Sequence, residues 1–95
     1  MHIISRKALQ AFWVQHPDSK EPLNRWFKIM RQTRFRSLTA LRRTFPTADK
    51  VGEYVVFNIA GNKYRLIASL HFNRGKVYIR HVLTHQAYDR GGWMT

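Results

Sequence analysis

Residues 53–72 read EYVVFNIAGNKYRLIASLHF, and this stretch decides the fold. Apolar and polar residues alternate through it with a period of two, which is typical of β-strands that are buried on one face. Two such runs flank Gly61-Asn62, and a short turn with glycine between two strand patterns predicts a β-hairpin. NRGK at 73–76 predicts a second turn that leads into a third strand, VYIRHVLT, at 77–84.

The N-terminal half has a helical pattern instead. HII at 2–4 predicts a short strand, and a first helix follows from an N-cap at Ser5 to a stop at Pro17. Asp18 or Ser19 is expected to cap a second helix. The apolar faces of the two helices carry Leu9, Phe12, Trp13 and His16 in the first, and Leu23, Trp26, Phe27 and Met30 in the second.

Between the second helix and the hairpin, residues 34–50 predict a basic connector with one helical turn at 38–43. The order of elements is then β-α-α-β-β-β over a single domain, residues 1–95. We therefore predict an α+β fold in which an N-terminal strand and two helices pack on one face of a small antiparallel sheet.

The turns also predict which side chains share a face of the sheet. With Gly61-Asn62 as the first loop, Asn58 pairs with Arg65; with residues 73–76 as the second, Arg65 pairs with Thr84 and Ser69 with Arg80. We expect an open polar face with His85 and Tyr88 just beyond the third strand and with Asn58, Arg65, Ser69, His71, Arg80 and Thr84 upon it. The core face is expected to carry Val55, Phe57, Ile59, Tyr64, Leu66, Ala68, Leu70, Phe72, Val77, Ile79, His81 and Leu83.

The charge of the chain indicates its class of partner. Seventeen lysines and arginines stand against five acidic residues, a formal net charge of +12, which favours nucleic acid or the ribosome. An anionic membrane surface is less favoured, because neither helix has a fully basic face opposite a strongly apolar one. The sequence has no cysteine, which suits a reducing cytoplasm, and we expect neither a signal peptide nor a membrane span.

Several kinds of chemistry lack the residues that they need. The five acidic residues are scattered, whereas a metal-dependent nuclease needs clustered carboxylates. His81 and His85 are four residues apart but have no third ligand at zinc spacing. Phosphate-binding glycine loops and a serine nucleophile motif are missing too. We therefore expect no metal and no cofactor.

Cleavage of RNA by its own 2′-hydroxyl remains possible with these residues. That reaction needs a proton acceptor, a proton donor and a cation for the developing negative charge. His85, Tyr88 and Arg65 could supply this set. The structural alternatives are that His85 is a surface residue, that Tyr88 covers the core, and that His81 is a structural histidine.

Two motifs carry a resemblance to a known family. FN-x-x-GN-x-x-R at Phe57–Arg65 and IR-x-V-x-TH-x-x-YD at Ile79–Asp89 resemble the HigB toxin family, as do HIISRKAL and SLTALRRTFPTADKV upstream. The resemblance implies a RelE-like fold and a bacterial type II toxin of the cytoplasm that cleaves mRNA, usually on the translating ribosome at its small subunit. It also implies a HigA-type antitoxin with a helix-turn-helix domain, through which alone the toxin would reach operator DNA.

The resemblance also implies site residues. The family motif positions expected at the active surface are Asn58, Arg65, His85 and Tyr88, with Arg80 as a phosphate contact. On chemistry alone, the further candidate RNA contacts are Lys63, His71, Arg74 and Lys76. A non-catalytic RNA- or ribosome-binding protein is the alternative, because the charge alone would suffice for it. Direct DNA binding is disfavoured, because no helix pair has a helix-turn-helix pattern.

Overall fold

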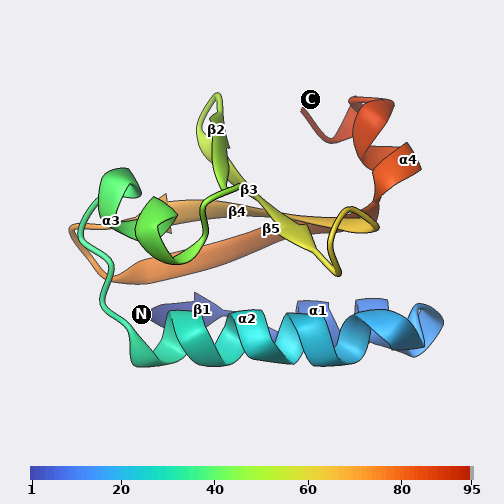
Figure 1. Ribbon diagram of the computed structural model, residues 1–95, viewed down its shortest axis with the longest axis horizontal. Helices are drawn as coiled ribbons and strands as arrows, with labels where there is room; N and C mark the ends of the chain where they lie inside the picture. The colour runs from blue at the N-terminus through green and yellow to red at the C-terminus, as the bar shows by residue number, and fades with distance from the viewer. Residues whose placement is uncertain (95) are drawn as a thin grey trace.

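A five-stranded mixed sheet lies at the centre of the protein in the computed structural model, which describes residues 1–94 (Figure 1). Its strands are β1 (His2–Ile4), β2 (Asp49–Val51), β3 (Tyr54–Ile59), β4 (Tyr64–His71) and β5 (Lys76–Thr84), in the order β1-β5-β4-β3-β2. β1 runs parallel to β5 while the other pairs are antiparallel, so the sheet is mixed where the sequence predicted an antiparallel one.

Two helices cover one face of this sheet, as predicted (Figure 1). α1 (Arg6–Gln15) ends before the short 3₁₀ turn η1 (Pro17–Ser19), because proline cannot continue a helix. α2 (Lys20–Gln32) follows at once. The expected helical turn in the connector is α3 (Leu38–Thr44), whose first turn is capped by the Ser37 hydroxyl, which accepts from the Ala40 amide at 3.1 Å.

The main core lies between these helices and the sheet. Leu9, Leu23 and Met30 have no exposed surface, and Trp26 meets Phe57 edge to face at 5.4 Å. From the sheet, the fully buried partners are Leu66, Ala68 and Val77. Each large apolar side chain buried in this way stabilises the fold by ~1.5–3 kcal/mol, which holds the sheet rigid beneath the residues on its other face.

The β3–β4 register is the one that the sequence predicted. Asn58 pairs with Arg65 and Val56 with Ile67. The β4–β5 register was predicted wrongly, because the ladder begins at His71 and Lys76 rather than at Phe72 and Val77. Ser69 therefore lies opposite Tyr78 instead of Arg80, and beyond a bulge in β5 Arg65 lies opposite Leu83 instead of Thr84.

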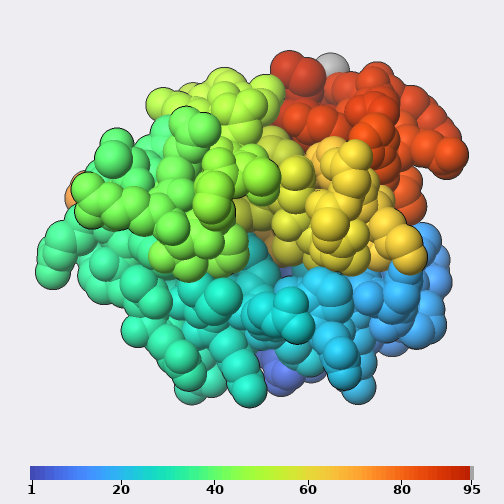
Figure 2. Space-filling view, viewed as in Figure 1, coloured from blue at the N-terminus to red at the C-terminus, as the bar shows by residue number. Residues whose placement is uncertain are grey.

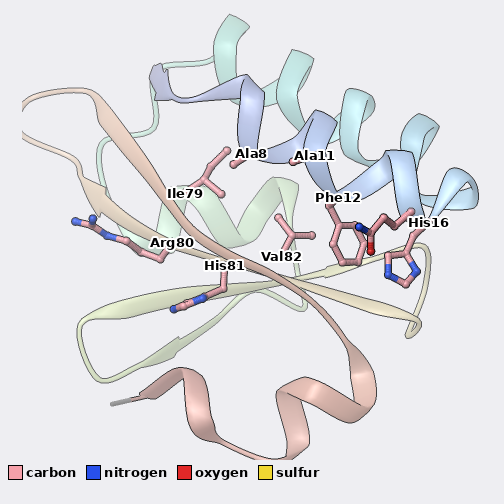
Figure 3. A pocket seen from close by; sticks show the side chains of 9 residues that line it. Ala8, Ala11, Phe12, His16, Ile79, Arg80, His81 and Val82 are labelled. Atoms are coloured by element: carbon pink, nitrogen blue, oxygen red, sulfur yellow. The ribbon is translucent and has the colours of Figure 1, made fainter.

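A β-bulge then changes the faces of the second half of β5. Ile67 pairs with His81 while Ala68 pairs with Ile79, so Arg80 is the extra residue on β5. One extra residue exchanges the two faces of the strand beyond it. Figure 3 shows the result: Ile79 and Val82 point toward α1, whereas His81 points to the opposite side of the sheet.

Three residues were therefore assigned to the wrong face. His81 and Leu83 were expected in the helix-covered core, but His81 lies opposite Ile67 and Leu83 packs in a second apolar cluster on the other face. Thr84, expected beside Arg65 on the open face, pairs with Tyr64 instead.

The C-terminal segment covers part of the face that the sequence left open. α4 (His85–Asp89) and the 3₁₀ turn η2 (Gly92–Met94) follow β5 and lie across the sheet from α1 and α2 (Figures 1 and 2). Trp93, only 7% exposed, packs there against Val56 and Ile67. Within residues 1–94, no helix is long and apolar enough to cross a membrane.

Candidate active site

The predicted catalytic histidine and tyrosine lie on α4, a helix that the sequence did not predict. β5 stops at Thr84 because this residue, in an extended conformation, caps the helix: its hydroxyl accepts from the Ala87 amide at 3.1 Å. The His85 amide donates to the Lys63 carbonyl at 2.9 Å, which ties the start of α4 to the β3–β4 turn. The tail is therefore a fixed element rather than a loop.

Arg65 lies on the expected face but does not point freely into solvent. Its side chain is buried, and the residue is 8% exposed. Nη1 donates to the carbonyls of Asn62 and Tyr64, and Nη2 donates to the Asn62 side-chain oxygen at 2.6 Å. Its guanidinium also lies 5.5 Å from the centre of the Tyr88 ring. In this arrangement Arg65 supports the turn and Tyr88, and its terminal nitrogens already have acceptors.

Tyr88 is held from a second direction by Trp93. The two rings stack at 5.2 Å with an interplanar angle of 14°, and the indole N–H donates to the Tyr88 carbonyl at 2.9 Å. Arg65, Tyr88 and Trp93 thus form a connected stack. Since α4 contains no buried residue of its own, this stack and the bond from the His85 amide to Lys63 fix it to the sheet.

Asn58, Arg65, Lys63, His85 and Tyr88 come together at one end of the sheet. Asn58 is exposed beside Arg65 on the neighbouring strand. Lys63 lies in the adjoining turn and contacts α4 through its carbonyl. The structure therefore gathers the four predicted catalytic residues and one predicted RNA contact at the β3–β4 turn and α4.

Asp18 adds an acidic group to this end. Its carboxylate accepts from the Tyr64 hydroxyl at 2.6 Å and from Lys63 Nζ at 3.0 Å. The hydrogen bond from Tyr64, followed by that from Lys63, lowers the pKa of Asp18, and the same bond from Tyr64 to the carboxylate raises the tyrosine's own pKa. Asp18 thereby fixes the position of Lys63 and offsets part of its charge.

A shallow pocket of about 320 Å³ opens beside these groups. Its lining includes His16, which stacks on Phe12 at 4.4 Å, and His85. The pocket is further lined by Asp18, Lys63, Tyr64, Thr84 and Gln86. A histidine from α4 therefore shares a concave surface with a lysine, as a site for a phosphate and its neighbouring hydroxyl requires.

The other predicted RNA contacts lie toward the opposite end of the sheet. Arg80 donates from Nε to the Ser69 hydroxyl at 3.1 Å, and its guanidinium lies 5.3 Å from the centre of the Tyr78 ring. His71 meets the same ring edge on at 5.3 Å. Arg74 and Lys76 lie at the β4–β5 turn and the start of β5.

His71 lies six residues after Arg65 along β4, a distance of roughly 20 Å at the rise of a β-strand. The predicted site residues thus form two groups, a catalytic end and a basic-aromatic end. A chain of several nucleotides could contact both, whereas one nucleotide could not.

Another concave surface lies between α1 and β5, and its lining includes Arg80 of the basic-aromatic end and His16 of the pocket beside His85. α1 and β5 enclose a pocket lined in part by Ala8, Phe12, Ile79 and Val82, which Figure 3 shows from close by. Its lining is mainly apolar and contains none of the four predicted catalytic residues. We therefore assign this pocket no part in the proposed chemistry.

Sequence reasoning missed Asp18, Trp93 and Asp89 as parts of this site. Asp18 was considered only as a helix cap, and no local signal links it to Lys63, 45 residues away. Trp93 follows two glycines, a composition that suggests a loose end. Asp89 could have been found, because a spacing of four on a helix places it beside His85.

Comparison with known proteins decides the family. Residues 19–91 match the HigB toxin family, described as the RelE-like toxic component of a toxin-antitoxin system. The chain belongs to this family. The match covers α2 to α4 and therefore both groups of predicted site residues.

Individual HigB proteins are similar over almost the whole chain. The mRNA interferase toxin HigB of Escherichia coli (strain K12) is 34% identical over 92 residues, which cover 94% of this chain and 88% of that protein. The mRNA interferase HigB of Shigella flexneri is similar to the same extent. That of Escherichia coli O6:H1 is 26% identical over 93 residues, with 95% and 90% coverage. Membership in a toxin-antitoxin family implies an antitoxin partner.

Proposed function

We propose that this protein is the toxin of a type II toxin-antitoxin system and an endoribonuclease that cleaves mRNA on the translating ribosome of the bacterial cytoplasm. One observation carries the proposal: His85 is bonded to the turn that holds Lys63, and Tyr88 on the same helix is contacted by Arg65. The membership in the HigB family and the similarity to mRNA interferases support it.

The proposed reaction uses the 2′-hydroxyl of the RNA as the nucleophile. His85 accepts the 2′-hydroxyl proton, because a neutral imidazole is an effective base near neutral pH. Lys63 contacts the phosphate, and the buried Arg65 guanidinium beside Tyr88 adds positive charge to the site. The Tyr88 ring is engaged by Arg65 and Trp93, which favours its hydroxyl as the group that it offers to RNA. The products are a cyclic phosphate and a free 5′-hydroxyl.

The second group of residues would bind RNA that continues beyond the cut. Arg80, Tyr78 and His71 place a cation and two rings on one surface, an arrangement that suits phosphates and unstacked bases. Arg74 and Lys76 extend the positive charge along the same path, and Asn58 would contact RNA at the catalytic end. The net charge of +12 supports binding at the small ribosomal subunit, which is surrounded by RNA phosphates.

We further propose a HigA-type antitoxin with a helix-turn-helix domain as the partner, with operator DNA reached only through it. Co-expression with the neighbouring small reading frame should restore growth and give one complex on gel filtration. Separate elution of the two proteins would refute this part of the proposal.

His85→Gln tests the proposed chemistry. Glutamine keeps much of the size and hydrogen bonding but cannot take up the proton, so single-turnover cleavage on programmed ribosomes should fall by ~10²-fold or more. Ribosome binding should be unchanged. The matched control is His2→Gln, which removes an exposed histidine on β1, at the end of β5 away from α4. Equal cleavage by His85→Gln and the parent would refute the role of His85; ribosome binding by a parent that cuts no RNA would favour the non-catalytic alternative.

A further inference from the structure

Asp89 contacts the histidine that the proposed reaction uses. The two residues are four apart on α4, and Asp89 Oδ2 lies 2.8 Å from His85 Nδ1. At this spacing two side chains lie on the same side of a helix, one turn apart. The contact is therefore built into the helix and needs no other element.

Stability alone does not account for this pair. The side chains are 42% and 58% exposed, and an exposed ion pair at this helical spacing contributes only ~0.3–0.5 kcal/mol. The pair has a clearer consequence for which imidazole nitrogen of His85 carries the proton. A carboxylate beside Nδ1 can only accept a hydrogen bond, so it holds the proton on Nδ1 and leaves Nε2 as the nitrogen with a free lone pair.

Hydrogen bonds of the backbone fix the start of the helix that carries His85. The His85 amide is bonded to the Lys63 carbonyl, and the Thr84 cap fixes the first turn. The His85 side chain also lines the pocket that contains Lys63. With Nδ1 occupied by Asp89, Nε2 is the atom available to a group bound in that pocket.

We propose that Asp89 is a positioning residue that sets the tautomer and orientation of His85 for RNA cleavage, an inference that rests on the function proposed above. The 2′-hydroxyl proton passes to His85 Nε2 while O2′ bonds to phosphorus. The bond from phosphorus to O5′ breaks, its electron pair stays on O5′, and O5′ takes a proton from a neighbouring acid or water. The Asp89 carboxylate stabilises the imidazolium that forms, the role that the aspartate of a Ser-His-Asp triad has toward its histidine.

The first test reads the tautomer directly and needs no activity. Two-dimensional ¹H–¹⁵N NMR of the imidazole, recorded where His85 is neutral, should show Nδ1–H in the parent. Asp89→Ala should shift it toward Nε2–H, the form that free histidine prefers in water. Asp49→Ala, which removes an exposed aspartate on β2, is the control and should leave His85 unchanged. An Nε2–H tautomer in the parent would overturn the proposal.

The second test compares cleavage with binding. Asp89→Ala should slow single-turnover cleavage on ribosomes by ~10–100-fold, as loss of such outer partners does, with ribosome affinity unchanged. Asp89→Glu, whose carboxylate can still reach one helical turn back, should recover part of the rate. In the His85→Gln background the Asp89 substitution should have no further effect, because the two act as one unit.

The two tests separate this inference from the proposed function. If the parent protein cuts no RNA, the proposed function is refuted. The NMR result still decides whether Asp89 sets the tautomer of His85. A further loss of cleavage from Asp89→Ala in the His85→Gln background would show that Asp89 acts independently of His85. An equal loss of ribosome binding would show that it acts on affinity, and either result overturns the inference.

Discussion

Replacing Trp93 by alanine should detach the C-terminal segment from the sheet. A buried tryptophan removes about 200 Å² from water, which stabilises by ~5 kcal/mol at ~25 cal/mol per Å². Truncation to alanine in a packed site costs ~3–5 kcal/mol. Trp93 is 7% exposed and also bonds the Tyr88 carbonyl, so a loss of at least ~3 kcal/mol is expected at this site.

The loss should be local, because α4 contains no buried residue and rests on the stack of Trp93, Tyr88 and Arg65. The main core beneath α1 and α2 does not include Trp93. At 1.4 kcal/mol for each factor of ten, ~3 kcal/mol raises the population of the detached segment by ~10²-fold. Growth arrest and cleavage should be lost with it, since His85 and Tyr88 are both on α4.

Amide hydrogen exchange measures this prediction. The amides of Ala87, Arg90 and Gly91 are bonded within the segment and should exchange ~10²-fold faster in Trp93→Ala, while those of β4 keep their protection. Met94→Ala is the control, because Met94 is 60% exposed. Unchanged exchange at the three amides in a folded Trp93→Ala protein would refute the reasoning that Trp93 anchors the helix.

Two further predictions concern stability. The lowered pKa of Asp18 means that the Tyr64–Asp18 bond stabilises above pH ~4 and is lost as the pH falls through the carboxyl's folded-state value. The raised pKa of Tyr64 means that the bond stabilises below pH ~10 and is lost as the pH rises through the raised value. Urea unfolding should therefore show a deficit for Tyr64→Phe at neutral pH that shrinks in acid; a deficit that stays constant from pH 7 to pH 2 would contradict this. Gly75→Ala should cost ~1 kcal/mol more than Gly52→Ala, because both have a positive φ but only the Gly75 substitution displaces the Arg34 guanidinium from the β4–β5 turn; equal urea midpoints would show that Arg34 contributes nothing.

The identity of the main elements follows from local sequence. Helical spacing placed Leu9, Leu23 and Met30 in the core, and Pro17 separated the two helices, because amphipathic periodicity and proline act within a few residues. The β3–β4 register also follows from sequence, since a short turn leaves the two strands few ways to pair. The joint position of Asn58 and Arg65 is a direct consequence.

The end of β5 could not be resolved in this way. Val82 and Leu83 are adjacent and both apolar, so alternation of apolar and polar residues fits either face there. The bulge at Arg80 settles the choice by sending Val82 to the main core and Leu83 to the Trp93 cluster. Such a bulge depends on how well both faces pack at once, which is a property of the whole sheet.

By itself, the sequence determined the α+β class, the helix faces, the polyanion-binding charge and the residue types of the candidate site. Only the tertiary structure decided that Trp93 covers the open face, that Asn62 and Tyr88 engage Arg65, and that Asp18 holds Lys63. The physical reason is the separation along the chain of the residues that interact. Periodicity and capping are set by neighbours within a turn or two of chain, whereas these contacts join segments that meet only when the sheet has closed around its core.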